Sequence, residues 1–369
     1  MVKVTFNKDM LKTTFYNKTV LVTGHTGFKG SWLCIWLTML GAKVVGYALD
    51  PYSKNDNFNI CGVSDIIHDV RADIRDFEYL QKVVCEYKPS MIFHLAAQPL
   101  VLDGYNRPKY TYDVNVGGTI NVLECLRQYE WIRHLLVVTS DKCYENKEWC
   151  WGYRENDPMG GCDPYSSSKA CAEIITHAYL KSFFSEQDNN NESKTVTSTR
   201  AGNVIGGGDW GSYRLLPDCF RSLVDHKTIE LRNPRSVRPW QHVLEPLGGY
   251  LKLMCFQNHV PNISGAWNFG PSLSSIVTVE EIVEKVVKLW GVGKWENANN
   301  KQQPHEATLL SLDCSKAKFL LDWEPVLSVD DAVRWTVQWY KAFHNSEKSM
   351  YKVCRNQITN YMGKILYEE

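Results

Sequence analysis

The chain has 369 residues, 44% of them hydrophobic and 22% charged, which is an ordinary composition for a globular protein of one large or two modest domains. Lysine plus arginine and aspartate plus glutamate both number 41, so the charge balance gives no reason to expect a nucleic acid or a membrane surface as a partner. Residues 1–17 are polar and mixed, and the 12 cysteines form no Cys-x-x-Cys pair. We therefore expect no signal peptide, no membrane-spanning segment, no metal site, and reduced thiols in a cytoplasmic protein.

A glycine-rich turn follows the first predicted strand, Thr19–Thr23, and precedes an apolar helix predicted over Ser31–Leu40. Its spacing, G-x-x-G-x-x-G, differs from the standard dinucleotide fingerprint, but the strand and the helix supply the context that such a turn needs. Glycine lets the backbone bend tightly and approach a pyrophosphate, whose charge a helix N-terminus favours. We expect a dinucleotide to contact Gly24, Thr26, Gly27, Phe28, Lys29 and Gly30.

An acidic residue follows the second predicted strand, Lys43–Leu49. Asp50 stands where a carboxylate accepts hydrogen bonds from an adenosine ribose and repels a 2′-phosphate. This position favours NAD over NADP, and a solvated turn carboxylate is the alternative. Asp73 and Ile74 follow a third short strand and are expected near the adenine.

Small residues close the fourth predicted strand, Met91–Ala96, and would let the backbone lie against the cofactor. A helix predicted over Tyr110–Tyr129 carries Asn115 within its apolar face. Because a buried amide needs partners, Asn115 is expected to brace a neighbouring strand or a water near the cofactor, or to be a satisfied core amide. From this region the predicted cofactor contacts are Ala96, Ala97, Gln98 and Asn115.

The fifth predicted strand, Leu135–Thr139, is a short valine-rich run that suits a strand buried on both faces. Ser140, Asp141 and Lys142 stand directly at its polar end. A hydroxyl, a carboxylate and an amine at one strand end are groups that can hold and transfer protons.

A helix predicted over Ser166–Phe184 brings Tyr165 and Lys169 onto one face of its first turns. An ammonium beside a buried phenol favours the phenolate, and the Ser140 hydroxyl could share the proton in transfer. A Tyr-x-x-x-Lys pair alone is a weak signal, because a surface tyrosine near a surface lysine gives the same pattern. Its place after the strands and glycines described above is what favours catalysis.

Strand and helix alternate through the first half, which predicts a doubly wound parallel sheet of Rossmann type, with ligands at the carboxyl ends of the strands. A smaller C-terminal α/β substrate-binding domain is expected beside it. The boundaries are 15–203 plus roughly 241–270 for the NAD-binding domain, and 204–240 plus 271–345 for the second domain. Residues 346–369 form a tail of unclear role. Further helices are predicted over Phe77–Tyr87, Glu245–Phe256, Thr278–Trp290, Cys314–Leu321 and Val329–Phe343, and the segment Leu215–Val224 is amphipathic.

The second half carries two further polar groupings. The strand Thr195–Ala201 leads to Asn203 and to three glycines, 206–208, that suggest a flexible segment over a ligand or a plain loop. Arg235 and Arg238 stand close together, and guanidinium groups suit phosphate oxygens. A solvated basic loop is the alternative for these arginines.

Taken together, these residues resemble the extended short-chain dehydrogenase/reductase family. The resemblance rests on the glycine turn, Asn115, the pair of Tyr165 and Lys169, and Arg200-x-x-Asn203, and it covers about residues 17–345. Longer strings within it are similar to the nucleotide-sugar 4,6-dehydratases of that family that act on CDP-glucose. These strings, which are more specific than the short motifs, occupy 139–144, 151–158, 206–210 and 238–246.

This resemblance implies a redox-neutral loss of water in which NAD takes hydride from the sugar C4 and returns it to C6. The Tyr165 phenolate would take the O4 proton with Lys169 beside it, and Ser140 would hold O4. Asp141 would protonate the departing C6 hydroxyl. Lys142, where related dehydratases carry Glu, would remove the C5 proton, with stabilisation of the enolate as the alternative role. A lysine base must be neutral, and Lys169 could be the cation that depresses its pKa.

The resemblance also implies where the nucleotide sugar binds. Relatives tend to carry an arginine where this chain has 102–104, Leu-Asp-Gly, so sugar or nucleotide preference is open. A 4-epimerase, a dehydratase for another nucleotide sugar and a dinucleotide-binding module without chemistry are the alternatives, and Asp141 favours dehydration over epimerisation. A homodimer or homotetramer and a role in deoxysugars of surface polysaccharides are also implied. The expected substrate contacts are Asn203, Trp210, Arg238, His305 and Glu306.

Overall fold

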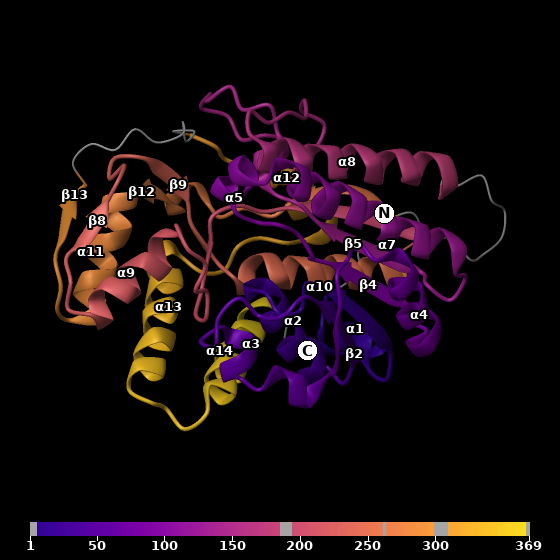
Figure 1. Ribbon diagram of the computed structural model, residues 1–369, viewed down its shortest axis with the longest axis horizontal. Helices are drawn as coiled ribbons and strands as arrows, with labels where there is room; N and C mark the ends of the chain where they lie inside the picture. The colour runs from indigo at the N-terminus through magenta and orange to yellow at the C-terminus, as the bar shows by residue number, and fades with distance from the viewer. Residues whose placement is uncertain (1–5, 185–193, 261–262, 299–308, 367–369) are drawn as a thin grey trace.

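The computed structural model describes residues 6–184, 194–260, 263–298 and 309–366. In Figure 1 a layered α/β unit occupies the right-hand side, and a smaller group of helices and short strands lies to the left. Among the described residues no helix has the length and apolar character needed to cross a membrane.

A seven-stranded parallel sheet forms the centre of the layered unit, in the order β11-β6-β5-β4-β1-β2-β3. The chain builds outward from β1 in one direction and then returns to β4 on the other side, so the strand order reverses between β1 and β4. This confirms the predicted doubly wound sheet, whose ligand site belongs at that reversal. The strands are β1 (Thr19–Thr23), β2 (Lys43–Ala48), β3 (His68–Arg71), β4 (Met91–His94), β5 (His134–Val138), β6 (Thr195–Arg200) and β11 (Gly265–Asn268).

Alternating side chains of the strands supply two separate cores. On β1, Val20 and Val22 pack into one cluster, and Leu21 packs into the other. Because successive side chains of a strand point to opposite faces, an apolar run such as β1 needs helices on both sides.

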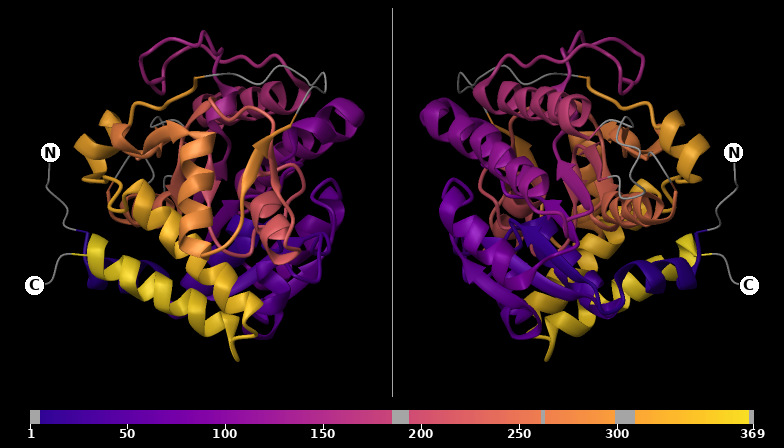
Figure 2. Two further views of the ribbon diagram at one scale, coloured as in Figure 1. Left: turned by 90° about the vertical axis from the view of Figure 1, so that its left-hand side faces the viewer. Right: turned by 90° about the vertical axis from the view of Figure 1, so that its right-hand side faces the viewer.

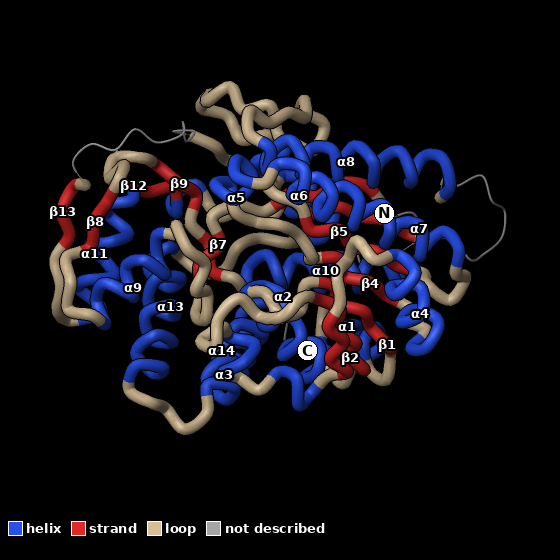
Figure 3. Tube along the Cα trace, in the orientation of Figure 1, coloured by secondary structure: helices blue, strands red, loops and turns tan. Residues whose placement is uncertain are grey.

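Helices cover both faces of the sheet, as Figure 3 shows. One face carries α4 (Phe77–Tyr87), α7 (Gly118–Gln128) and α8 (Pro164–Phe183), and the other carries α1 (Lys8–Phe15), α2 (Phe28–Met39), α10 (Leu244–His259) and α14 (Met350–Ile365). The short helices α3 (Asn57–Ile60), α5 (Val101–Asn106) and α6 (Pro108–Tyr112) lie in connections near the carboxyl ends of the strands.

The smaller group is built from helices and two-stranded pairings. Its helices are α9 (Leu215–Val224), α11 (Val279–Trp290) and α13 (Val329–His344), whereas α12 (Ser315–Leu321) packs on β11 and α10 of the layered unit. The strand pairs are β7 (Val204–Ile205) with β10 (Gln241–His242), β9 (Val237–Pro239) with β12 (Ile276–Thr278), and β8 (Ile229–Leu231) with β13 (Trp295–Asn297).

The helix expected over Tyr110–Tyr129 is confirmed as a continuous helical stretch, but it is divided into α6, a π-helical turn at Asp113–Gly117 and α7, and Asn115 lies in that turn. The segment 346–369, set apart as a tail, contains α14, which packs on α2 and α13. Buried Met350, Cys354, Ile358 and Tyr361 recur along one stripe of α14, so its charged composition conceals an amphipathic helix.

The helix α1 was not anticipated either, because 1–17 reads as a polar segment. Leu11 and Phe15 are buried, and α1 packs against α10. In Figure 2 the indigo α1 and the yellow α14 lie along the same edge of the molecule, and Leu11 and Met362 line one small surface hollow between them.

Candidate active site

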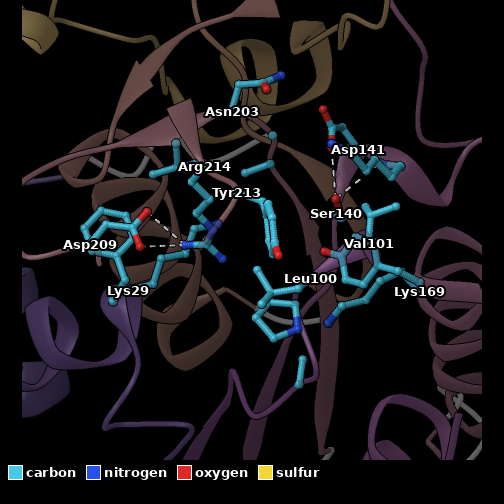
Figure 4. Close-up of a pocket in the computed structure, with 18 of the residues that line it drawn as sticks. Lys29, Leu100, Val101, Ser140, Asp141, Lys169, Asn203, Asp209, Tyr213 and Arg214 are labelled. Carbon is cyan, nitrogen blue, oxygen red and sulfur yellow. Dashed lines mark hydrogen bonds and ion pairs between the residues drawn. The ribbon is translucent and has the colours of Figure 1, made fainter. Parts of the chain in front are cut away.

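A large cavity, about 960 Å³ in volume, opens at the carboxyl ends of β1, β4 and β5 and extends under the smaller group. In Figure 4, Ser140, Asp141 and Lys169 lie on one side of it and Asp209 and Arg214 on the other. The cavity therefore lies where the strand order reverses, between the two parts of the fold.

The glycine turn after β1 is packed too closely to accept side chains. Gly24 has φ +75°, and a Cβ there would lie 2.6 Å from the Ala96 nitrogen. A Cβ on Gly30 would lie 2.2 Å from the Gly24 oxygen. Gly27 precedes α2 and provides no side-chain cap, so the first amides of this helix face the cavity without one. Such a cradle fits the pyrophosphate of a dinucleotide. All of Gly24, Thr26, Gly27, Phe28, Lys29 and Gly30 line the cavity.

The acidic residues expected around the adenosine lie at the open end. Asp73 and Ile74 line the cavity. Asp50 follows β2, and its side chain is 89% exposed and forms a 3.3 Å ion pair with Arg71. Asp50 is therefore at the rim of the cavity rather than in its lining, and accessible to a ribose.

The residues after β4 divide into a lining pair and a bracing pair. Ala96 and Ala97 line the cavity. Asn115 Oδ1 accepts a 2.8 Å hydrogen bond from the Gln98 nitrogen, and its Nδ2 donates to Ser168 Oγ at 2.8 Å. Gln98 and Asn115 thus lie behind the cavity surface and hold the β4 loop against α8.

The polar residues after β5 form a short hydrogen-bonded chain. Ser140 Oγ donates to Asp141 Oδ1 at 2.9 Å, and Lys142 Nζ lies 3.9 Å from the same oxygen. The second oxygen, Asp141 Oδ2, is buried and has no hydrogen-bond partner within the described part of the chain. A buried acceptor in that condition is a place for a ligand hydroxyl.

The helix α8 begins with Asp163 as its side-chain cap and places Tyr165 in the cavity lining. Burial raises the pKa of Tyr165, and the Lys142 charge and a hydrogen bond with Ser140 oppose that rise. Lys169 Nζ donates to the Val138 carbonyl at 3.1 Å, and burial lowers its pKa to about 8. The cation that lowers the pKa of Tyr165 most is therefore Lys142, whereas Lys169 was expected to have this role.

The substrate side contains two of the expected contacts. Asn203, in the left-handed backbone region at φ +48°, and Arg238 both line the cavity. Trp210 does not; its indole packs edge-on against Tyr340 and Phe343, at centroid distances of 5.2 and 5.6 Å. His305 and Glu306 lie outside the described residues.

The glycines at 206–208 serve close packing. A Cβ on Gly207 would lie 1.9 Å from the Trp339 ring, and the Gly207 carbonyl accepts a 2.9 Å hydrogen bond from Trp32 Nε1. The Asn57 nitrogen donates to the Gly208 carbonyl at 3.3 Å. This turn is therefore fixed to both parts of the fold rather than left as a flexible cover.

Two residues that the sequence did not single out lie in the cavity. Arg214 Nη1 donates to both carboxylate oxygens of Asp209 at 2.9 Å, and Figure 4 shows the guanidinium between Asp209 and Tyr213. Tyr213 has φ +61° and is 65% exposed. The available signal was a basic residue immediately before α9, but basic residues in loops are common.

Comparison with known proteins agrees with this geometry. The family model for GDP-mannose 4,6 dehydratase matches residues 21–336. The chain belongs to this family. That membership confirms the resemblance to the extended short-chain dehydrogenases/reductases.

Among relatives of this dehydratase family, a CDP-glucose 4,6-dehydratase from Salmonella typhimurium strain LT2 is 46% identical over 354 residues, 95% of this chain and 98% of that protein. The structure of dTDP-glucose 4,6-dehydratase from Bacillus anthracis in complex with NAD has 25% sequence identity and a TM-score of 0.73, covering 91% of this chain and 99% of that one. UDP-glucose 4-epimerase from Thermotoga maritima shares the fold, with 19% identity, a TM-score of 0.75, and coverage of 88% and 99%.

Proposed function

We propose that the protein is a CDP-glucose 4,6-dehydratase that converts CDP-D-glucose to CDP-4-keto-6-deoxy-D-glucose and water with NAD as cofactor. The observation that carries this proposal is the 46% identity to a CDP-glucose 4,6-dehydratase over 95% of the chain. The glycine cradle and the polar residues after β5 share one cavity, which supplies both a cofactor site and proton-transfer groups.

The cradle fits NAD. Gly24, Gly27 and Gly30 would hold its pyrophosphate at the start of α2, with Asp73 and Ile74 near the adenine and Asp50 within reach of the ribose. When bound, NAD supplies a hydride acceptor for the sugar C4 and a hydride donor for C6. A carboxylate near the adenosine ribose opposes a 2′-phosphate, which favours NAD over NADP.

Tyr165 and Ser140 would act at the sugar O4. Tyr165 accepts the O4 proton as C4 is oxidised, and Ser140 positions O4 through its hydroxyl. The positive charge of Lys142 favours the phenolate. Burial raises the pKa of Tyr165, and among the groups that lower this pKa Lys142 has the largest effect. Lys169 holds the strand end through Val138.

Asp141 and Lys142 would carry out the elimination. Asp141 gives its proton to the departing C6 hydroxyl, and the unpartnered Oδ2 is the atom we assign to this contact. Lys142, charged while C4 is oxidised, passes its proton to Asp141 and then, in its neutral form, removes the C5 proton, which the 4-keto group acidifies. Because Lys142 Nζ lies 3.9 Å from Asp141 Oδ1 and Lys169 Nζ is hydrogen-bonded to the Val138 carbonyl, Asp141 rather than Lys169 is the neighbour that would take part in this proton exchange.

Cationic side chains would hold the diphosphate of the nucleotide sugar. Arg238 and Arg214 both line the cavity, and Arg214 is held by Asp209. Guanidinium groups bind phosphate oxygens in pairs. Asn203 would contact the sugar next to them.

The decisive experiment is mass spectrometry of the sugar nucleotide after incubation of the protein and NAD with CDP-, dTDP-, UDP- and GDP-hexoses. We expect loss of one water from CDP-glucose without net formation of NADH. Water loss from a different nucleotide would keep the reaction and assign another substrate, whereas an isomer of unchanged mass would establish a 4-epimerase. Absence of any change across the panel would contradict the proposal.

Further features belong to the same proposal. The cofactor domain is assigned to 15–203 plus roughly 241–270, and the nucleotide-sugar domain to 204–240 plus 271–345. We propose a homodimer or homotetramer that pairs through α7 and α8, since Ile174 and Phe183 of α8 are exposed. A cytoplasmic location and a product used for deoxysugars of surface polysaccharides, such as O-antigen, complete the proposal.

A further inference from the structure

Glu173 is a buried carboxylate on α8 to which the proposed chemistry gives no role. It follows Lys169 by one helical turn, as Lys169 follows Tyr165, so the three side chains share one face of the helix. The Glu173 side chain is only 4% exposed. A charge this deeply buried has to be paired and hydrogen-bonded.

The partners of Glu173 come from the two strands whose ends carry the polar residues of the cavity. Its Oε1 accepts a short hydrogen bond from Thr139 Oγ1, and Thr139 directly precedes Ser140. Its Oε2 accepts from Ser198 Oγ at 2.6 Å and from Arg200 Nη2 at 2.8 Å. One carboxylate therefore joins α8 to the ends of β5 and β6.

Arg200, the partner of Glu173 in this ion pair, connects it to a residue that lines the cavity. Arg200 Nη1 donates to Tyr144 OH at 2.6 Å and to the Glu155 carbonyl at 3.0 Å. Tyr144 lines the cavity. The network thus runs from the helix that carries Tyr165 to the loop that follows β5.

The charged and titratable groups around Lys169 come from several elements. Glu173 on its own helix and Cys143 after β5 influence the pKa of Lys169, and the Lys169 charge in turn lowers the pKa of His94 on β4 and of Lys29 on α2. Burial lowers the pKa of Lys169 to about 8, and the Glu173 carboxylate is the strongest influence in the opposite direction. Burial also lowers the pKa of His94 to about 3 and that of Lys29 to about 8, so His94 adds no charge at neutral pH.

We propose that Glu173 is a positioning residue for the proposed reaction: it fixes α8 against the ends of β5 and β6 and keeps Lys169 charged and bonded to Val138. Only the expected effect on kcat depends on the proposed function. Its structural content, a charged Lys169 that depends on Glu173, concerns this chain alone. A purely architectural ion pair would fix the helix without affecting the titration of Lys169.

The test compares Glu173→Gln with Glu124→Gln. Glu124 is a matched control, because it also ties α8 to a neighbouring element, accepting a 2.8 Å hydrogen bond from Tyr179 OH, but from the far end of the helix. The titration of Lys169 is followed by NMR of the full-length protein with labelled lysine side chains, and Lys169→Met assigns the signal. Thermal unfolding of each variant is recorded alongside.

We expect Glu173→Gln to lower the pH at which Lys169 loses its proton by about one pH unit or more, and Glu124→Gln to leave it unchanged. With CDP-glucose and NAD, the alkaline limb of the pH profile of kcat should move to lower pH in Glu173→Gln by a similar amount. KM should change little. Glu173→Asp, which retains the charge, should restore the wild-type titration of Lys169.

An unchanged Lys169 titration in Glu173→Gln overturns the inference, even if the variant is less stable. If that variant does not fold, Glu173→Gln combined with Arg200→Gln removes the unpaired charge as well, and the same titration decides. If the wild-type protein were inactive on CDP-glucose, the proposed function would be contradicted. The NMR comparison of Lys169 would still test the inference.

Discussion

The two sides of the cavity are built from different materials. The cofactor side, defined by Gly24, Gly27, Gly30 and Ala96, is backbone and small residues packed within van der Waals distance of one another. The substrate side, defined by Asp209, Arg214 and Arg238, is charged side chains from a loop and a short strand. The cofactor side therefore depends on shape, whereas the substrate side depends on charge.

This difference determines which kind of substitution should weaken ligand binding on each side. One added methyl group has no room on the cofactor side, although it changes no charge. On the substrate side a change of charge should weaken binding even where the shape is kept. The following experiments separate these two kinds of failure, in order of decreasing effect.

Tyr165→Phe tests the point where the two sides meet. The change removes the group that accepts the O4 proton while leaving both sides of the cavity intact, so kcat should fall by about 10²- to 10⁴-fold. Binding of NAD and of CDP, measured by calorimetry, should stay close to wild type. Loss of either ligand in this variant would show that Tyr165 supports the cavity rather than the chemistry.

Gly30→Ala tests the cofactor side. The new Cβ would lie 2.2 Å from the Gly24 oxygen, so the turn has to move and NAD affinity should fall by about 10- to 100-fold, about 1.4 to 2.7 kcal/mol. The control is Gly363→Ala on α14, where a Cβ meets nothing within 4 Å. CDP affinity should change little in either variant, and an equal loss of both ligands would contradict the division into two sides.

Arg214→Gln tests the substrate side. The side-chain length is nearly kept but the charge is lost, so KM for CDP-glucose should rise about 10-fold and its dependence on salt should weaken. NAD affinity should be retained. Arg334→Gln on α13, where Arg334 is about half exposed and paired with Asp331, serves as the control and should match wild type. A larger effect on NAD than on CDP-glucose would reassign Arg214 to the cofactor.

Lys29 is a charged residue of the cofactor side, and its pH dependence gives the smallest expected effect. Burial lowers the pKa of Lys29 to about 8, so the ammonium is present below that pH and lost above it. NAD affinity should therefore decline about threefold between pH 7 and pH 9 as the cation near the pyrophosphate disappears. Titration calorimetry on Lys29→Met should show a flatter dependence, and an equally steep one would exclude Lys29 as the cause.

The cofactor side was largely predictable from the sequence, because its signals are local. The strand Thr19–Thr23 and the helix Phe77–Tyr87 have the predicted bounds. Hydrophobic periodicity and the spacing of glycines predict such strands, helices and turns from neighbouring residues alone. Asn115 was harder, since a π-helical turn is invisible to helical periodicity and only the hydrogen bonds to Gln98 and Ser168 show its use.

The substrate side was less predictable, because it is assembled from segments far apart in the chain. Trp210 is an aromatic residue after three glycines, but its partners Tyr340 and Phe343 draw it into the core. Arg214 looks like any basic loop residue until Asp209 orients it. The helix that carries Tyr165 and Lys169 was identified correctly. The cation with the largest effect on the pKa of Tyr165 is, however, Lys142 after β5, and the spacing of residues along a helix cannot reveal a contribution from another element.

The C-terminal helix has a consequence for the order in which the chain can fold. α14 covers part of α2, which follows the first strand, so one of the earliest helices to be synthesised is buried by one of the last. Trp36 of α2 meets Tyr361 of α14 edge-on at 5.7 Å, and that contact cannot form until almost the whole chain has left the ribosome. Until α14 has emerged, the nascent nucleotide-binding unit therefore lacks the helix that covers part of α2.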